Sequence, residues 1–178
     1  KPRDGKMAGF QLWVNLPAQL KMTRPRYQEI ASSQIPEVPL ENGGAIRVIA
    51  GQYQGMQGAV TDIYADPTYL DVRLAPHSTF RHPIERGHSA FAYLFEGQAR
   101  MRLAEDAIGE WLDSPRLIAF GDGDHVEIDS HDQGARFLLV SGKPLHEPIA
   151  RYGPFVMNTR QEIQQTLQEL REGTFPPD

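Results

Sequence analysis

The 178-residue chain contains no cysteine, and this absence excludes several kinds of chemistry. Disulfides, thiolate metal ligands and cysteine nucleophiles are all ruled out. A chain without cysteine suits a reducing compartment, so we expect a cytoplasmic protein. Long apolar runs are also missing, because stretches such as residues 137–140 are far shorter than the roughly 20 residues that a membrane-spanning helix needs. We therefore expect no membrane partner.

An excess of positive charge is absent as well. The 18 Lys and Arg residues are outnumbered by 23 Asp and Glu residues, which gives a formal net charge of -5. Non-specific binding to phosphate backbones depends on clustered basic side chains, so we expect no direct nucleic-acid partner. Sequence motifs for nucleophilic catalysis and for nucleotide binding are missing too. Ser141 lacks the G-x-S-x-G frame, and the glycines of residues 51–58 lack the ending of a phosphate loop.

The middle of the chain contains a series of short segments in which apolar and polar residues alternate. This period of two is typical of strands, and Gly, Pro, Asp and Asn separate the segments. Many short strands without a helical pattern between them predict an antiparallel sandwich or barrel. Glu96 and Gly97 are expected to form a two-residue turn between two strands. The predicted strands are residues 46–52, 58–64, 69–74, 89–95, 99–103, 116–120, 125–128 and 136–140.

The two ends of the chain carry other signals. Residues 10–14 alternate like a strand with unlike faces, and a second short strand is expected over residues 26–30. Near the other end, Thr159 and Glu162 form a capping box that predicts the start of a helix. Gly173 is placed to provide a left-handed cap at its end. The helix carries one apolar stripe, formed by Ile163, Leu167 and Leu170.

Two blocks of sequence, in the order found in the family, resemble the carboxy-terminal half of the pirin family. The first is GFQLWVNLP at residues 9–17 with PRYQEI at residues 25–30, and the second is GKPLHEPIARYGPFVMNTRQEI at residues 142–163. Pirins are bicupins, with two stacked β-barrels in one polypeptide. The resemblance implies an all-β fold, namely a cupin-type antiparallel β-barrel (a double-stranded β-helix or jelly roll) with a C-terminal α-helix. It also implies a mainly non-haem iron family, with quercetin dioxygenase-type activity in some members and transcription co-regulation in others.

The resemblance also suggests how the chain is organised. We expect residues 1–40 to be a remnant of the first cupin and the interdomain passage, residues 41–157 to form the C-terminal cupin barrel, and residues 158–178 to form the helix and tail. The chain begins with Lys1 and not with methionine, so we expect a piece of a longer bicupin or a member that lost its first barrel. Residues 11–14, within the segment of residues 9–17, would then expose apolar side chains and unpaired amides, which proteins usually cover. The expected partner is therefore a second copy of the chain, in a homo-oligomer, or a first cupin barrel.

The resemblance places the family's iron in the first barrel, held by a His-x-His pair and a later His-x-Glu. Neither pattern occurs in this chain, so no ligand is carried over from the family. Within His88 to Gly97, the glutamate position of the first cupin motif falls on Ala90, and its histidine pair falls near residues 84–86. In the second motif the histidine position falls near His125. One imidazole does not hold iron, so we expect neither a metal nor another cofactor in this chain. The remaining candidate ligands are His82, His88 and His125.

These observations lead to two main functional hypotheses. In the first, the chain is a pirin-like C-terminal cupin domain that lacks metal ligands and serves as a structural or interaction module. In the alternative, it is part of an iron-dependent quercetin 2,3-dioxygenase-type pirin whose first barrel supplies the metal. Whether this chain takes part in catalysis is left open, and no catalytic or cofactor-binding residue is assigned. Carboxylates that could meet across strands, without a pattern that brings them together, are Glu85, Glu96, Glu105 and Asp106.

A third hypothesis is a small-molecule pocket in the mouth of the barrel. Phe91, Tyr93, Phe95 and Phe120 could line such a pocket. The first three share one face of a predicted strand, and we expect this face to point inward as ordinary core.

Overall fold

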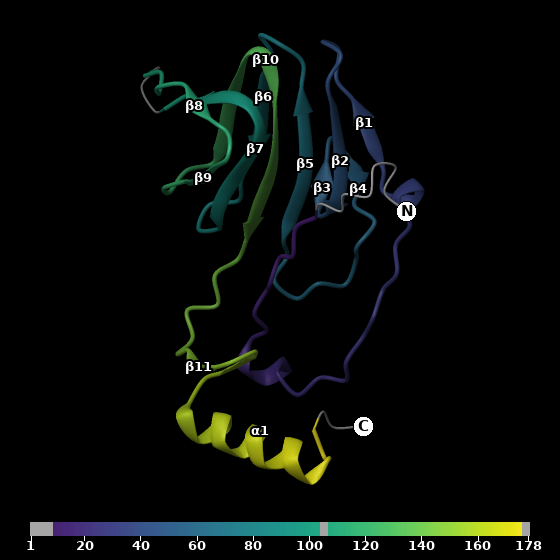
Figure 1. The fold of residues 1–178 in the computed structure, drawn as a ribbon, viewed down its shortest axis with the longest axis vertical. Helices are drawn as coiled ribbons and strands as arrows, with labels where there is room; N and C mark the ends of the chain where they lie inside the picture. The colour runs from purple at the N-terminus through teal and green to yellow at the C-terminus, as the bar shows by residue number, and fades with distance from the viewer. Residues whose placement is uncertain (1–8, 104–106, 176–178) are drawn as a thin grey trace. The chain divides into compact units, whose positions relative to one another are not determined.

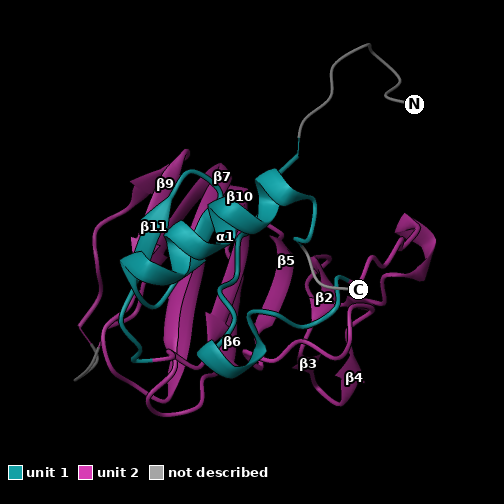
Figure 2. Ribbon diagram, turned by 90° about the horizontal axis from the view of Figure 1, so that it is seen from below, with its two compact units in different colours: residues 1–25, 146–178 teal, residues 26–145 magenta. Residues whose placement is uncertain are grey.

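The computed structural model describes residues 9–103 and 107–175. The chain divides into two compact units, which Figure 2 colours separately. One unit consists of residues 26–145 and contains the main sheet. The other consists of residues 1–25 and 146–178 and contains the C-terminal helix.

The main sheet of the larger unit is antiparallel and is organised around β7 (Ser89–Met101) and β10 (His125–Gly142). Its strand order is β1-β2-β5-β10-β7-β8, while β6 pairs with β10 and β9 pairs with β7 (Figure 1). This architecture confirms the predicted antiparallel all-β fold. The other elements of this unit are η2 (Ser32–Gln34), β1 (Glu37–Pro39), β2 (Ala45–Ala50), β3 (Gln52–Tyr53), β4 (Met56–Gln57), β5 (Thr68–Leu74), β6 (Thr79–Pro83), β8 (Leu112–Asp113) and β9 (Arg116–Ala119).

The core of the larger unit is formed by one face of each main strand. On β6, for example, Phe80 and His82 are buried while Arg81 between them is exposed, because successive side chains of a strand point to opposite faces. Each fully buried aliphatic or aromatic side chain contributes about 1.5–3 kcal/mol to folding. The largest fully buried side chains are Phe80, Phe137, Ile46, Leu70, Leu94, Ile128, Leu139, Val48 and Val72.

The sequence predicts two interruptions between strands that the structure does not have. Glu96 and Gly97 lie inside β7 and not in a turn, and the predicted gap between residues 128 and 136 lies inside β10. The register between the two strands shifts in this region. Gly97 and Gly134 adopt φ angles of 74° and 73°, and a Cβ at Gly97 would collide with the carbonyl oxygen of Gly134. These glycines therefore allow an irregular close approach of two continuous strands, which sequence alone does not distinguish from a turn.

Three other predicted strands are also corrected. Residues 10–14 and 26–30 are not assigned to strands, and of residues 58–64 only Val60 forms an isolated bridge, with Ala50. An alternating pattern becomes a strand only where a neighbour offers hydrogen-bonding partners to its backbone. The described residues form no such ladder with these segments.

The smaller unit contains η1 (Ala18–Leu20), a hairpin of β11 (Ala150–Tyr152) and β12 (Phe155–Met157), and the helix α1 (Arg160–Glu172). The helix contacts both strands of the hairpin. Its buried residues are Ile163 and Thr166, whereas Leu170 of the predicted stripe is 48% exposed. No helix within the described residues combines the length and apolar character that crossing a membrane requires.

Both predicted caps of α1 are confirmed. The backbone N–H of Glu162 donates to Oγ1 of Thr159 at 3.2 Å, and the backbone N–H of Thr159 donates to the carboxylate of Glu162 at 2.8 Å. Gly173 ends the helix with a φ of 74°. Another carboxylate, that of Glu147, joins the two segments of this unit, because it accepts hydrogen bonds from the backbone of Ala18 at 2.8 Å and from the side chain of Asn158 at 2.9 Å.

Candidate functional site

A cavity of ≈ 650 Å³ lies in the larger unit where β6 ends and β10 begins. His82 is one of its lining residues and is only 6% exposed. The centroid of its ring is 5.7 Å from that of Tyr53 and 6.1 Å from that of Phe80, and both pairs are stacked. Burial lowers the pKa of His82 below its ordinary value of 6.5, because apolar surroundings disfavour the charged ring. A neutral imidazole is therefore available at this cavity.

His125, the second candidate ligand, lines the same cavity but contacts a carboxylate. Its Nδ1 lies 2.7 Å from Oδ1 of Asp124, and a guanidinium nitrogen of Arg86 lies 2.6 Å from the other carboxylate oxygen. Hydrogen bonds from His125 and from Arg86 hold the pKa of Asp124 below its usual range. The side chain of His125 is 40% exposed. The cavity thus brings two of the three predicted histidines together.

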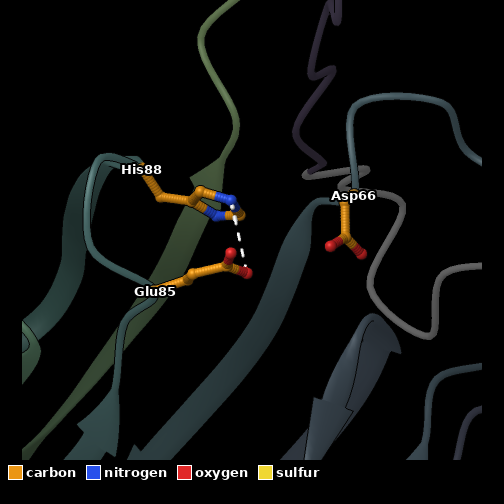
Figure 3. Close-up of side chains that lie close together, drawn as sticks. All are labelled: Asp66, Glu85 and His88. Carbon is orange, nitrogen blue, oxygen red and sulfur yellow. Dashed lines mark ion pairs between the residues drawn. The ribbon is translucent and has the colours of Figure 1, made fainter.

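His88, the third candidate, does not line this cavity and lies beside two carboxylates. Its Nε2 is 3.6 Å from Oε2 of Glu85, as the dashed line in Figure 3 shows. Asp66 completes a group in which one possible ligand atom from each residue lies within 4.8 Å of the others. Across residues 9–103 and 107–175, this is the one group of three His, Asp or Glu side chains that is close enough to share a metal ion. Sequence reasoning singled out His88 and Glu85 but missed Asp66, because no motif links Asp66 to them.

Two of the positions to which the cupin motif assigns metal ligands hold apolar side chains. Ile84 is 8% exposed and belongs to the hydrophobic core, and Ala90 packs against this core. Neither side chain carries a lone pair for a metal. Neither of these two residues can therefore act as a ligand at the position that the cupin motif gives it.

The aromatic face of β7 corrects another expectation. Ala92 and Leu94 are fully buried, whereas Phe91, Tyr93 and Phe95 on the opposite face are only half-buried. The inward face of this strand is thus the face of Ala92 and Leu94, and the expectation that the three aromatic residues point into the core is wrong. They do not line the cavity around His82.

The carboxylates considered from the sequence are dispersed. Glu85 lies beside His88, while Glu96 lies 3.6 Å from the guanidinium of Arg136. Glu105 and Asp106 lie outside the described residues. The described carboxylates of this set therefore form no pair suited to general acid and base catalysis.

Comparison with known proteins identifies the family. Residues 69–176 match the sequence model of the family described as the Pirin C-terminal cupin domain. The chain belongs to the pirin family. Human pirin is 36% identical over 165 residues, which cover 92% of this chain and 55% of human pirin. The family resemblance to the carboxy-terminal half of pirins is thereby confirmed.

Two further comparisons concern proteins named for an activity. A candidate quercetin 2,3-dioxygenase of Thermoplasma acidophilum is 34% identical over 183 residues, which cover 98% of this chain and 67% of that protein. The crystal structure of quercetin 2,3-dioxygenase from Acinetobacter baumannii has a TM-score of 0.77 at 33% identity, covering 92% of this chain and 55% of that one. The cupin-type fold is confirmed by these likenesses. The chain spans between 55% and 67% of the length of these three proteins.

Proposed function

We propose that this chain is a pirin-like C-terminal cupin domain that works as a structural or interaction module and does not hold the family's iron in its cupin positions. The observation that supports this proposal is the burial of Ile84 and the core packing of Ala90 where a cupin places ligands. Apolar side chains at these two positions stabilise the core and remove two of the donors that an iron ion needs. The imidazoles of His82 and His125 line one cavity, but within the described residues neither belongs to a group of three possible ligands close enough to share a metal ion.

The proposed interaction surface is the segment of residues 9–17. Trp13 is 60% exposed, Val14 is 45% exposed and Leu12 is 36% exposed. Adjacent exposed apolar side chains on a segment outside any ladder favour association with another surface. The relatives extend beyond the part that this chain matches, so we place a first cupin barrel on this segment, with a second copy of the chain as the alternative partner.

The alternative function is participation in a quercetin 2,3-dioxygenase-type pirin in which the first barrel supplies the iron. The specific support is the name of two relatives at 33–34% identity, from Acinetobacter baumannii and Thermoplasma acidophilum. In that case the cavity around His82 would help to shape the surroundings of the substrate, and no ligand from this chain would be required.

Oxygen uptake distinguishes the two functions. The chain is loaded anaerobically with Fe²⁺, and oxygen consumption is measured after quercetin is added. The expected result is no quercetin-dependent uptake, both for the wild type and for the His82→Gln/His125→Gln double variant. Uptake by the wild type that the double variant loses would contradict the proposal. Uptake that arises only on co-expression with the unmatched part of the Thermoplasma acidophilum relative favours the alternative.

Sedimentation velocity tests the proposed interaction surface. At micromolar concentration, the wild type is expected to form a dimer or to bind the unmatched part of the same relative. The Leu12→Ser/Trp13→Ser variant is expected to lose this association, because it removes two apolar contacts. Tyr27→Ser is the matched control, since Tyr27 is 86% exposed and lies outside the segment. A wild-type monomer that binds no such partner, or equal effects of both variants, would exclude residues 9–17 as the interface.

A further inference from the structure

We propose that Asp66, Glu85 and His88 form a binding site for a divalent transition-metal cation at the end of the sheet where strands β5 and β7 begin and β10 ends. The site uses neither His82 nor His125. It shares Glu85 with the stretch of residues 84–86 to which the cupin motif assigns its histidine pair, but His88 and Asp66 stand at no ligand position of that motif. It therefore adds a function to the domain that the family resemblance does not assign to any of these three residues.

The pairing of three neighbouring strands brings the site together. Ser141, near the end of β10, pairs with Thr68 of β5 on one side and with Ala90 of β7 on the other. Because β10 lies between the other two strands and is antiparallel to both, the residues just before β5 and just before β7 lie at the same end of the sheet. Strands are spaced 4.7–4.9 Å apart, so β5 and β7 are separated by about 10 Å here. Asp66 and His88 lie on opposite sides of this interval (Figure 3), and one possible ligand atom of each lies within 4.8 Å of the other.

A tight turn places Glu85 next to His88. The backbone N–H of His88 donates to the carbonyl oxygen of Glu85 at 3.0 Å. Gly87, the third residue of the turn, has a φ of 83°, which is the conformation that a type II turn requires at this position. The first and fourth Cα atoms of such a turn lie within about 7 Å of each other. The carboxylate and the imidazole are thus held together by the local backbone.

Asp66 is also fixed by its backbone. Its φ is 44°, in the left-handed region that aspartate tolerates better than most residues, and its N–H donates to the carbonyl oxygen of Ile63 at 3.3 Å. The preceding residue, Ala65, accepts a hydrogen bond from the backbone of Lys143 at 3.2 Å, directly after β10. The loop that carries Asp66 is therefore tied to the end of β10, and little reorganisation is needed when a cation binds.

The environment of His88 favours a cation over a simple ion pair. Its side chain is only 9% exposed, and its ring forms no hydrogen bond within the part of the chain that the structure describes. The distance of 3.6 Å to Glu85 exceeds that of a hydrogen bond. A cation could bind an imidazole nitrogen of this largely buried ring without first breaking a hydrogen bond.

The ligand set also indicates the class of cation. One imidazole nitrogen and two carboxylate oxygens suit Zn²⁺, Mn²⁺ or Fe²⁺ better than soft Cu⁺, which prefers sulfur ligands, or Ca²⁺, which takes six to eight oxygens. Two carboxylates balance the charge of a divalent ion. Because Glu85 is 73% exposed, solvent has access to the remaining coordination positions. Bound metal would join the loop before β5 to the turn before β7.

Mn²⁺ binding to the full chain, followed by electron paramagnetic resonance and equilibrium dialysis, tests this site. The wild type is expected to bind one Mn²⁺ per chain. Asp66→Asn, Glu85→Gln and His88→Gln should each weaken binding by about 10-fold or more, because each removes one ligand. His125→Gln is the matched control, since His125 also pairs with a carboxylate but lines the cavity around His82. Failure of the wild type to bind Mn²⁺ and Zn²⁺ stoichiometrically, or equal affinity of the wild type and all three variants, overturns the proposal.

Thermal unfolding provides a second measurement that does not depend on activity. A cation that binds only the folded state raises the melting temperature. Mn²⁺ should therefore raise the melting temperature of the wild type and of His125→Gln but not that of Asp66→Asn. Asp66 is exposed, so this substitution should preserve folding. Far-ultraviolet circular dichroism verifies that each variant is folded before titration. An equal rise for Asp66→Asn and the wild type contradicts the site.

Discussion

The ring of His82 stacks on the ring of Tyr53, with centroids 5.7 Å apart and planes inclined by 26°. Burial in this stack lowers the pKa of His82 below 6.5, so the unfolded chain takes up a proton at a higher pH than the folded protein does. As the pH falls below 6.5, the unfolded state holds more protons, and the free energy of unfolding decreases until the folded pKa is reached. This contribution is complete above about pH 6.5, and its slope is at most about 1.4 kcal/mol per pH unit.

The substitution His82→Phe should remove this pH dependence, because phenylalanine fills the stack without titrating. Urea unfolding at about pH 7.5 and about pH 5.5 measures the effect as the difference between the two free energies of unfolding. His125→Gln is the control, since His125 is 40% exposed and its replacement should leave the slope in place. An identical slope in His82→Phe and the wild type would show that His82 titrates normally.

Asp129 should be important for stability because three side chains donate hydrogen bonds to it. It is 5% exposed and accepts from Thr79 at 2.7 Å, from Arg100 at 3.1 Å and from Arg102 at 3.1 Å. Burial raises the pKa of Asp129, but the hydrogen bonds from Thr79, Arg102 and Arg100 outweigh burial and hold this pKa below its usual range. Asp129→Asn should therefore reduce the free energy of unfolding by about 2–3 kcal/mol at neutral pH.

Urea unfolding checks this value, with Asp113→Asn as the matched control. Asp113 accepts a hydrogen bond from Gln98 at an exposed position, so its substitution should change stability by no more than about 0.5 kcal/mol. The contribution of Asp129 is present above its unfolded pKa near 3.8 and is lost as the pH falls toward the folded pKa. The difference between the wild type and Asp129→Asn should accordingly shrink below about pH 3.8, and a difference that grows there would contradict the assignment.

The sequence predicts those parts of the fold that local signals determine. The helix α1 begins and ends where Thr159 and Gly173 predict, because both caps are made within a few residues of the chain. The length of β7 could not be predicted, since Gly97 favours a turn as readily as an irregular strand pair. Only the partner strand decides between them. In the same way, the alternation of residues 10–14 does not say whether a neighbouring strand is available.

The candidate metal group shows the same limit at the level of the site. The turn that joins Glu85 and His88 is local, with Gly87 as its signal. Asp66 lies in a loop that precedes another strand, and only the register of β5 and β7 with β10 places it there. The absence of the family's His-x-His and His-x-Glu patterns was visible in the sequence, whereas a ligand set drawn from three separate positions required the strand pairing.

The close approach of Gly97 to Gly134 can be tested by its contribution to the stability of the β7–β10 pair. Gly97→Ala introduces a Cβ that collides with the carbonyl oxygen of Gly134, at a φ of 74° that alanine rarely adopts. It should lower the free energy of unfolding by clearly more than about 1 kcal/mol. Gly55→Ala separates the two causes, because Gly55 has a φ of 82° but no atom within 4 Å of its added Cβ. Gly121→Ala, which has open space and no positive φ, should be nearly neutral. If urea unfolding gives equal losses for Gly97→Ala and Gly55→Ala, backbone strain alone explains the effect, and the close approach of β7 and β10 contributes nothing to it.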